Sequence, residues 1–324
     1  MSTQASTVAD TRPVGLEGQR ANELSSVSRR QRASYQKALL ERAAGDGLTQ
    51  EAMESLRTTD GWQRWLQVRC HLGGMDVRNQ LLMAHQRPGA RKVAGSRGWR
   101  TLGYEVRTDE RPIRVWAYVP PAKSALREWE QAGSRPQEKP EGELRLVPVF
   151  DQDQVSPQRD LPEPKEQRER PSRSSEANNL IRLLGQLIKF ASEIGAPVNF
   201  EPIAGVVRSY HEPGTGEIVI DASPDFPPAA RANRLIYELA NVLIDEDPRR
   251  PGLKLCNGER EVVARSVAWC VSSRAGRAYD ETITVPAQWA ADGGVVAVRY
   301  AALVDRVAGR LEGALPSGLD GEGE

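Results

Sequence analysis

The sequence has few cysteines and few histidines, with three of each among 324 residues. Cys70, Cys256 and Cys270 lack the short spacings of a zinc site, and an odd number of distant cysteines does not make a disulfide framework. We therefore expect reduced, buried thiols, which are typical of a cytosolic protein. The three histidines are scattered along the chain, so they support no Ser/His/Asp nucleophile arrangement: His71, His85 and His211.

Long apolar runs and phosphate-binding glycine loops are also missing. No run reaches the length of about 20 residues that a membrane-spanning helix needs. The first thirty residues lack the apolar core of a secretory signal. No glycine-rich loop of the P-loop or dinucleotide-binding kind is present, because Gly73-Gly74 and Gly293-Gly294 are isolated pairs typical of turns. We expect a soluble, cytoplasmic protein without a cofactor.

Net charge is zero, but the charge is unevenly distributed. The sequence has 44 basic and 44 acidic residues. Between Trp62 and Tyr118 there are eleven Lys or Arg and four Asp or Glu, a local excess of about seven positive charges. Local asymmetry of this kind attracts a polyanion even when the total charge is zero.

Composition and periodicity divide the chain into five parts. We expect a disordered tail at 1–28, an α+β domain at 29–150 and a linker at 151–175, because nine of the 22 prolines lie between Pro120 and Pro171. A mainly helical domain is expected at 176–312, followed by a second disordered tail at 313–324.

Apolar spacing predicts the elements within these parts. In the first domain we expect helices at 29–44, from an N-cap at Thr49 to residue 56, and from an N-cap at Asp76 to Gln86. Strands are expected at 92–94, 105–107, 113–119 and 144–150. In the second domain we expect a hairpin of 206–210 and 217–221, with helices at 176–194, 229–244, 259–275 and 296–315.

Aromatic residues suggest different roles in different places. Trp62 and Trp65 follow helical spacing and are interpreted as core residues. In the strand 113–119, Arg114, Trp116 and Tyr118 share one face. That face is either a platform on which bases stack or a second packing face against a helix.

The segment Asn79–Tyr104 is the strongest functional signal. It runs from an apolar helix through a Pro-Gly turn into a basic, glycine-punctuated stretch around Trp99. This pattern suits a groove that follows phosphates and stacks bases, although an ordinary solvated surface is the alternative. Trp99 would stack on a base, and Asn79 or Gln86 would either orient the loop or read a base edge. The residues expected to neutralise phosphates are Arg87, Arg91, Lys92, Arg97, Arg100, Arg107 and Arg114.

The pattern NQLLxxxQRPxAxxVAGxxxWxxLGxxV in this segment resembles the N-terminal domain of ArdC-type antirestriction proteins. Pro148-Val-Phe-Asp151 resembles the VFDxxQ segment that follows that domain. The resemblance implies binding of single-stranded DNA, and it implies protection of mobile-element DNA as the biological role.

The same family carries a zincin-like metallopeptidase domain, which implies a His-Glu-x-x-His helix and a glutamate ligand on the next helix. Here the histidine positions hold Tyr237 and Asn241, while Glu238 is retained at the position that activates water. The third ligand position would fall on Val263, or on Arg265 in a shifted register. We therefore expect a metal-free pseudo-metallopeptidase domain without enzymatic activity.

Two other functions stay open. The chain is an adaptor whose pseudo-peptidase cleft binds a protein partner, or it is a metallopeptidase with non-standard ligands. An apolar groove beside Tyr237 together with the absence of a basic groove would favour the first. Stoichiometric metal in the purified protein would favour the second.

Overall fold

A computed structural model describes residues 45–158, 173–212, 214–248, 255–277, 279, 282–291 and 295–315. The predicted tail at 1–28 and the predicted helix at 29–44 lie outside these residues. Leu48–Glu324 forms one compact unit, and a second unit comprises Met1–Gly47. The fold is α+β, mostly helical with small sheets, as the sequence predicts.

The first described helix spans residues 45–55 and starts before the predicted N-cap Thr49. Two further helices follow it. Helix α3 spans Thr59–Leu72 and α4 spans Val77–Gln86. The Asp76 side chain accepts a hydrogen bond from the backbone of Asn79, which confirms Asp76 as the predicted N-cap of α4.

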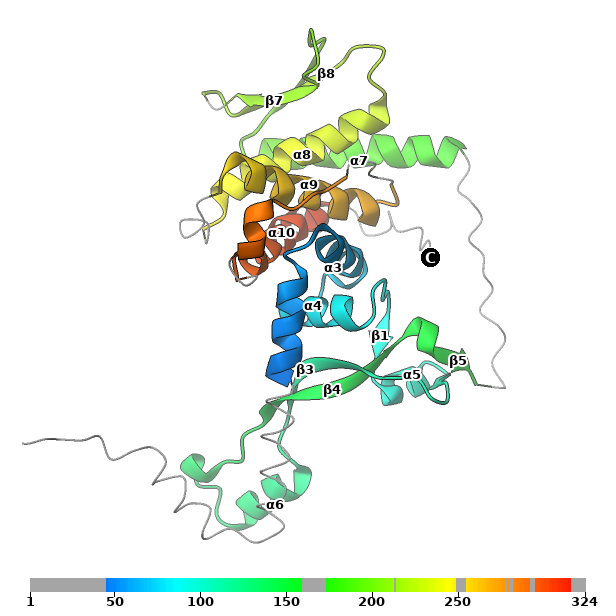
Figure 1. Ribbon diagram of the computed structural model, residues 1–324, viewed down its shortest axis with the longest axis vertical. Helices are drawn as coiled ribbons and strands as arrows, with labels where there is room; N and C mark the ends of the chain where they lie inside the picture. The colour runs from blue at the N-terminus through cyan, green and yellow to red at the C-terminus, as the bar shows by residue number, and fades with distance from the viewer. Residues whose placement is uncertain are drawn as a thin grey trace, which may run out of the picture. The chain divides into compact units, whose positions relative to one another are not determined.

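A three-stranded antiparallel sheet packs against α4. Its strands are β1 (Val93–Ala94), β4 (Glu143–Asp151) and β3 (Ile113–Val119), in the order β1-β4-β3. The alternation in β3 gives the predicted boundaries, with Ile113 paired to Val149 and Val119 to Glu143. Figure 1 shows helix α6 (Lys123–Gln131) at the end of the β3–β4 hairpin. A 3₁₀ turn, η1 (Pro136–Glu138), follows α6.

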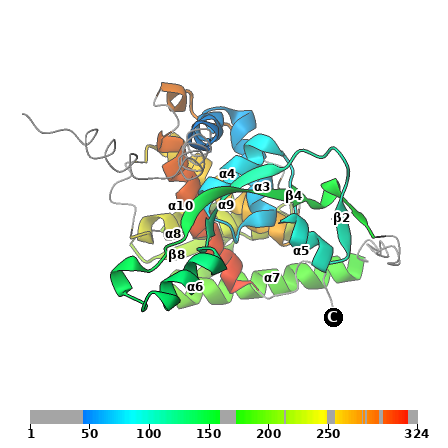
Figure 2. The same ribbon diagram turned by 90° about the horizontal axis from the view of Figure 1, so that it is seen from below.

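The part predicted as the start of the linker is ordered. The short helix α5 (Ser96–Thr101) lies beside β2 (Tyr104–Val106), as Figure 2 shows. Strand β2 pairs with β5 (Val155–Pro157), which follows the turn η2 (Gln152–Gln154). The predicted linker boundary at residue 151 is therefore wrong, because residues 151–158 complete this sheet.

Among the described residues from 173 onward, four α-helices and a small sheet form the C-terminal half. The helices are α7 (Arg173–Glu193), α8 (Pro228–Glu246), α9 (Asn257–Arg274) and α10 (Val295–Ala314). A turn, η4 (Ala287–Ala291), precedes α10. The sheet has the order β6-β8-β7, with β6 (Val198–Glu201) parallel and β7 (Ser209–Glu212) antiparallel to β8 (Glu217–Asp221). Figure 1 shows β7 and β8 beside α8.

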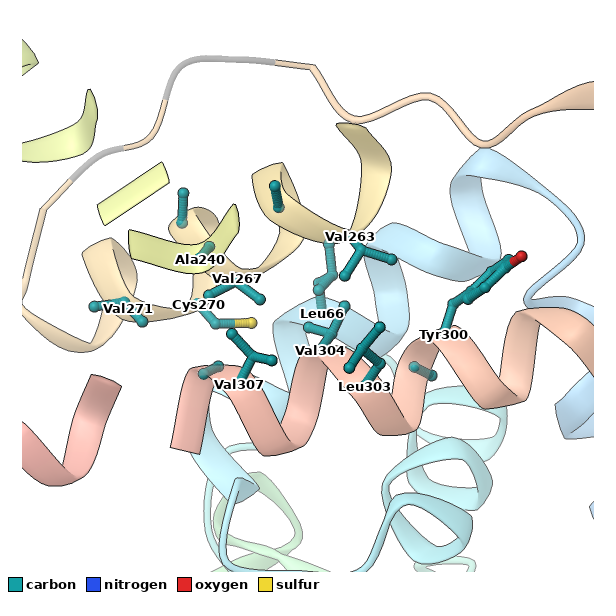
Figure 3. Packing of buried hydrophobic residues seen from close by; sticks show 14 of the residues in the cluster. Leu66, Ala240, Val263, Val267, Cys270, Val271, Tyr300, Leu303, Val304 and Val307 are labelled. Carbon is teal, nitrogen blue, oxygen red and sulfur yellow. The ribbon is translucent and has the colours of Figure 1, made fainter. Parts of the chain in front are cut away.

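The tryptophans predicted to be core residues join the two halves. Trp62 and Trp65 are fully buried, and the Trp62 indole donates a hydrogen bond of 2.8 Å to Ser266 on α9. Figure 3 shows Leu66 of α3 among Val263 and Val267 of α9 and Val304 of α10. Residues on both sides of the predicted domain boundary therefore share one hydrophobic core.

Arg69 adds an ionic contact to this core. Its side chain is only 1% exposed, and it pairs with Asp305 at 3.0 Å and with Glu312, both on α10. The pKa of Arg69 lies well above its ordinary value, because the attraction of nearby negative charge outweighs the effect of burial. Removing either side of such a buried pair leaves an uncompensated charge.

The three cysteines are free thiols with different exposure. Cys270 is buried, as predicted, and Cys70 is partly buried. The expectation is wrong for Cys256, which is exposed at the N-cap of α9, where its backbone N–H donates to Glu259. Within the described residues, no helix is both long and apolar enough to span a membrane.

Candidate nucleic-acid interface

The basic segment is attached to the fold through Asp151, a carboxylate that is 1% exposed. Asp151 accepts hydrogen bonds from the backbone N–H groups of Arg91 at 3.0 Å and Lys92 at 3.2 Å. Its own N–H donates to the Gln154 side chain at 2.9 Å. Asp151 and Gln154 are the fixed positions of the VFDxxQ motif, so this motif holds the backbone of the basic loop in place.

Four basic side chains of this segment extend into solvent: Arg91, Lys92, Arg97 and Arg100. Arg97 and Arg100 lie on α5, whereas the other two precede β1. In the described part of the chain, none of the four forms an ion pair or a side-chain hydrogen bond. Their charge is therefore available to an anion.

Trp99 does not present a free ring face, although the sequence suggests base stacking. It is 2% exposed, its indole N–H donates to the Phe150 carbonyl at 2.8 Å, and its ring meets Tyr104 edge-on at 5.8 Å. These contacts join α5 to β4 and β2. The stacking role is therefore corrected to a packing role, in which Trp99 positions the arginines on either side of it.

The side chains of Asn79 and Gln86 on α4 hydrogen-bond to the backbone of β3. The Asn79 amide donates to the Trp116 carbonyl and accepts from the Trp116 N–H, both at 2.8 Å. The Gln86 amide does the same for Arg114, at 2.8 and 2.9 Å. The two amides thus satisfy the edge of β3 that faces away from β4, as a neighbouring strand would. With these bonds made, neither amide is placed to read a base.

The remaining predicted cations differ in their surroundings. Arg107 forms an ion pair with Glu110 at 2.8 Å and donates to the Asp153 carbonyl, so its charge is already engaged. Arg114 is exposed on β3 and Arg87 is half-buried at the end of α4. Arg111, which sequence reasoning did not select, is exposed, and its carbonyl accepts from Gln154 at 2.8 Å.

The Arg114–Trp116–Tyr118 face of β3 is mixed. Trp116 is buried, and its indole donates to Thr49 in helix 45–55 at 3.0 Å, so the packing role holds for this residue. Tyr118 is 65% exposed and keeps its ring available, although its hydroxyl accepts from the Gly142 N–H. Tyr118 is therefore the aromatic residue of this face that keeps an exposed ring.

A second cluster lies between α8 and β7, around Glu238. This carboxyl group is 6% exposed and accepts a 2.7 Å hydrogen bond from the Ser209 hydroxyl. Burial raises the pKa of Glu238, while Ser209, Arg234 and His211 act in the opposite direction. His211 is also part of this cluster, since it lies on β7 two residues after Ser209.

Glu261 of α9, rather than Val263 or Arg265, hydrogen-bonds to Tyr237, which stands where the resemblance to the ArdC family implies a histidine. The Tyr237 hydroxyl donates to Glu261, which also pairs with Arg265. Burial and this hydrogen bond raise the pKa of Tyr237 to about 12. Val263 is fully buried in the core, whereas Glu261 reaches Tyr237. The register differs because the contact is set by how α9 crosses α8, which the sequence pattern alone does not contain.

The side chains of Tyr237 and Asn241 do not fit a zinc ion. Asn241 receives a hydrogen bond from Arg260 at 3.3 Å, and a neutral Tyr237 is a poor ligand. Within the described residues, no three His, Cys, Asp or Glu side chains come together in a group that could hold a metal ion. A guanidinium lies beside each of these two side chains: Arg260 donates to Asn241, and Arg234 sits over the Tyr237 ring at 5.7 Å.

The comparisons with known proteins give a distant structural likeness. The fold is similar to that of ArdC. The metal-free crystal structure of the antirestriction ArdC protein from plasmid R388 has a TM-score of 0.47 and 17% identity, covering 74% of this chain and 83% of that chain. Its Mn(II)-bound structure has a TM-score of 0.44 and 16% identity, covering 73% and 87%. No protein-family model and no curated protein matches the chain. The likeness is a coarse one, and the chemistry of this chain rests on its own residues.

Proposed function

We propose that the protein binds single-stranded nucleic acid through its basic segment. The observation that supports this most directly is the set of four exposed, unpaired cations on a backbone that Asp151 and Trp99 hold rigid. Preorganised cations lose little conformational freedom on binding a strand of phosphates. An ordinary solvated surface typically mixes charges of both signs, whereas these cations have no ionic partners.

The proposed mode is electrostatic, with one aromatic contact. Arg91, Lys92, Arg97 and Arg100 neutralise successive phosphates, and Arg114 extends the track toward Tyr118. Tyr118 supplies the exposed ring on which a base stacks. DNA is the proposed ligand, and protection of mobile-element DNA from restriction is the proposed role, following the resemblance in the residues around Asn79–Tyr104.

The experiment that tests this is fluorescence anisotropy with a labelled single-stranded oligonucleotide. Single-strand binding loses about 0.7 log unit of affinity per log unit of salt for each neutralised phosphate. Four contacts therefore predict a loss of about fifty-fold between about 50 and about 200 mM salt. The variant carrying alanine at Arg91, Lys92, Arg97 and Arg100 should bind weakly and with little salt dependence.

A matched control removes the same number of exposed cations from the C-terminal half: Arg182, Lys189, Arg299 and Arg310. This control should keep the affinity and the salt slope of the natural sequence. Equal losses in both variants would show that binding follows net charge alone, and the proposed interface would be wrong.

We also propose that the C-terminal half is not catalytic and holds no metal. Tyr237, Asn241 and their arginine neighbours support this, because they occupy the space that imidazole ligands would use. Elemental analysis of the purified protein should find no stoichiometric zinc or manganese. One bound metal ion per chain would overturn the proposal and favour a metallopeptidase with other ligands.

A second candidate function is binding of a protein partner beside β7. One observation favours it: the segment before this edge strand exposes Val206 at 95% and Val207 at 50%, and Tyr210 on β7 is also exposed. Exposed apolar residues next to a free strand edge are typical of peptide recognition. Replacing Val206 and Val207 by aspartate should abolish capture of a partner from host extract, while nucleic-acid binding stays unchanged.

A further inference from the structure

A surface pocket of about 540 Å³ lies next to the basic segment. Its volume is in the range of small-ligand sites. The pocket is formed by the end of α4, the 109–113 loop and the turn before β5: Gln86, Arg87, Asp109, Glu110, Arg111, Pro112, Ile113 and Gln154.

Two amide side chains make the walls of this pocket rigid. Gln86 is fixed by its paired hydrogen bonds to the backbone of Arg114. Gln154 donates to Glu110 at 3.1 Å and to the Arg111 carbonyl at 2.8 Å, and it accepts from the Asp151 N–H. Since Asp151 also holds the loop at Arg91, the pocket and the basic segment are attached to the same turn.

Three charged residues of the pocket form no ion pair within the described structure, although Arg87 lies close enough to Glu110 to interact with its charge: Arg87, Asp109 and Arg111. Glu110 differs, because hydrogen bonds from Arg107 and Gln154 lower its pKa and keep it charged and occupied. Asp109 has a φ of 68°, an uncommon conformation for a residue other than glycine. Such backbone strain is found preferentially at functional sites.

A carboxylate beside a guanidinium is complementary to guanine in particular. Guanine presents two donors, N1–H and the N2 amino group, next to the acceptors O6 and N7. A carboxylate accepts from the donors, and arginine binds O6 and N7 in the commonest base-specific contact. Thymine has only one donor on its pairing edge, and cytosine and adenine offer one amino group each. Bases of a single strand expose these edges.

We propose that this pocket binds one guanine nucleotide of the bound strand, an inference that rests on the proposed function. Asp109 accepts from N1 and N2, and Arg111, two residues along the chain, donates to O6 and N7. Arg87 at the end of α4 contacts the phosphate of that nucleotide, and the base lies against Pro112. The basic segment then supplies affinity, and the pocket supplies a preference for one base.

The test compares labelled oligothymidine strands that carry a single central dG, dA, dC or no substitution. The natural sequence should bind the strand with dG about ten-fold more tightly than the others. Asp109→Asn should remove this preference, so that the strand with dG binds no more tightly than plain oligothymidine. Asparagine tolerates positive φ, so this variant is expected to fold. The matched control, Glu105→Gln on β2, removes an exposed carboxylate nearby and should keep the preference.

The outcomes separate the two proposals. Equal affinity for all four strands would overturn the guanine pocket while leaving single-strand binding intact. A preference for dG that persists in Asp109→Asn would also overturn the assignment. Failure to bind any strand at low salt would instead overturn the proposed function itself.

Discussion

Asp151 offers the sharpest test of whether the basic segment works by position or by charge alone. The substitution Asp151→Ala removes the acceptor for the N–H groups of Arg91 and Lys92. A hydrogen bond to a charged group contributes about 1.5 to 3 kcal/mol, and water replaces part of it because both residues are exposed. The free energy of unfolding should therefore fall by about 2 to 4 kcal/mol, measured by urea denaturation.

The effect of this substitution on binding has two opposing parts. Removing a negative charge favours a polyanion, but phosphates bound at the ends of the exposed cationic side chains lie far from this buried carboxylate and are screened from it by the solvent between them. A loosened loop must be ordered on binding, at about 0.5 to 1.5 kcal/mol for each of two side chains. The second part is larger, so the affinity for a single strand should fall about ten-fold.

Anisotropy measured across a range of salt distinguishes these parts. All four cations remain in Asp151→Ala, so its salt slope should equal that of the natural sequence while its affinity is lower. Asp151→Asn keeps the oxygen that accepts from both N–H groups and should show a smaller effect. Equal or tighter binding by a folded Asp151→Ala protein would refute the positioning role.

Three further predictions concern the C-terminal half and its contact with α3. First, Tyr237→His combined with Asn241→His should bind one zinc per chain by elemental analysis, because Glu261 and Glu238 are retained. Zinc at about one hundred times its Kd should then add about 2.7 kcal/mol to the free energy of unfolding. Adding Glu261→Gln to the double variant should weaken zinc binding. A double variant that folds but binds no metal would contradict the reasoning. Second, burial raises the pKa of Glu238 in the folded state. The protonated carboxyl group is therefore compatible with the fold at low pH, and this contribution to stability is lost as pH rises through the folded-state pKa. Glu238→Gln should therefore melt higher than the natural sequence at about pH 8, with a difference that shrinks toward about pH 4, and a difference independent of pH would count against this. Third, Arg69→Met should lower the free energy of unfolding in urea by about 3 to 5 kcal/mol, since it leaves two partly buried carboxylates on α10 without their ionic partner; a change below about 1 kcal/mol would show that the ion pairs contribute little.

Several features follow from the sequence because they depend on neighbours along the chain. The N-cap at Asp76, the boundaries of β3 and the long C-terminal helices are set by capping residues and apolar periodicity, and the structure confirms them. The burial of Trp62 follows from the same periodicity. The exposed cations around α5 were also recognisable, since glycine and arginine clustering marks a surface loop.

Other features required the tertiary structure, because they depend on which distant groups meet. Trp99 looks like a stacking residue in a basic loop, but the Phe150 carbonyl and the Tyr104 ring bury it. Asn79 and Gln86 become backbone partners only because α4 lies along the edge of β3. Likewise, the crossing of α8 and α9 brings Glu261 to Tyr237.

The sequence by itself thus determined the long C-terminal helices, several of the strands, the location of positive charge and the absence of histidine at positions 237 and 241. Only the tertiary structure decided which side chains stay available for a ligand and which are used to hold the fold. The physical reason is that helical and strand periodicity is local, whereas burial and hydrogen-bond satisfaction involve residues far apart in the chain. Asp151 shows this most directly: its position after a strand was visible in the sequence, but its bonds to a loop sixty residues earlier were not.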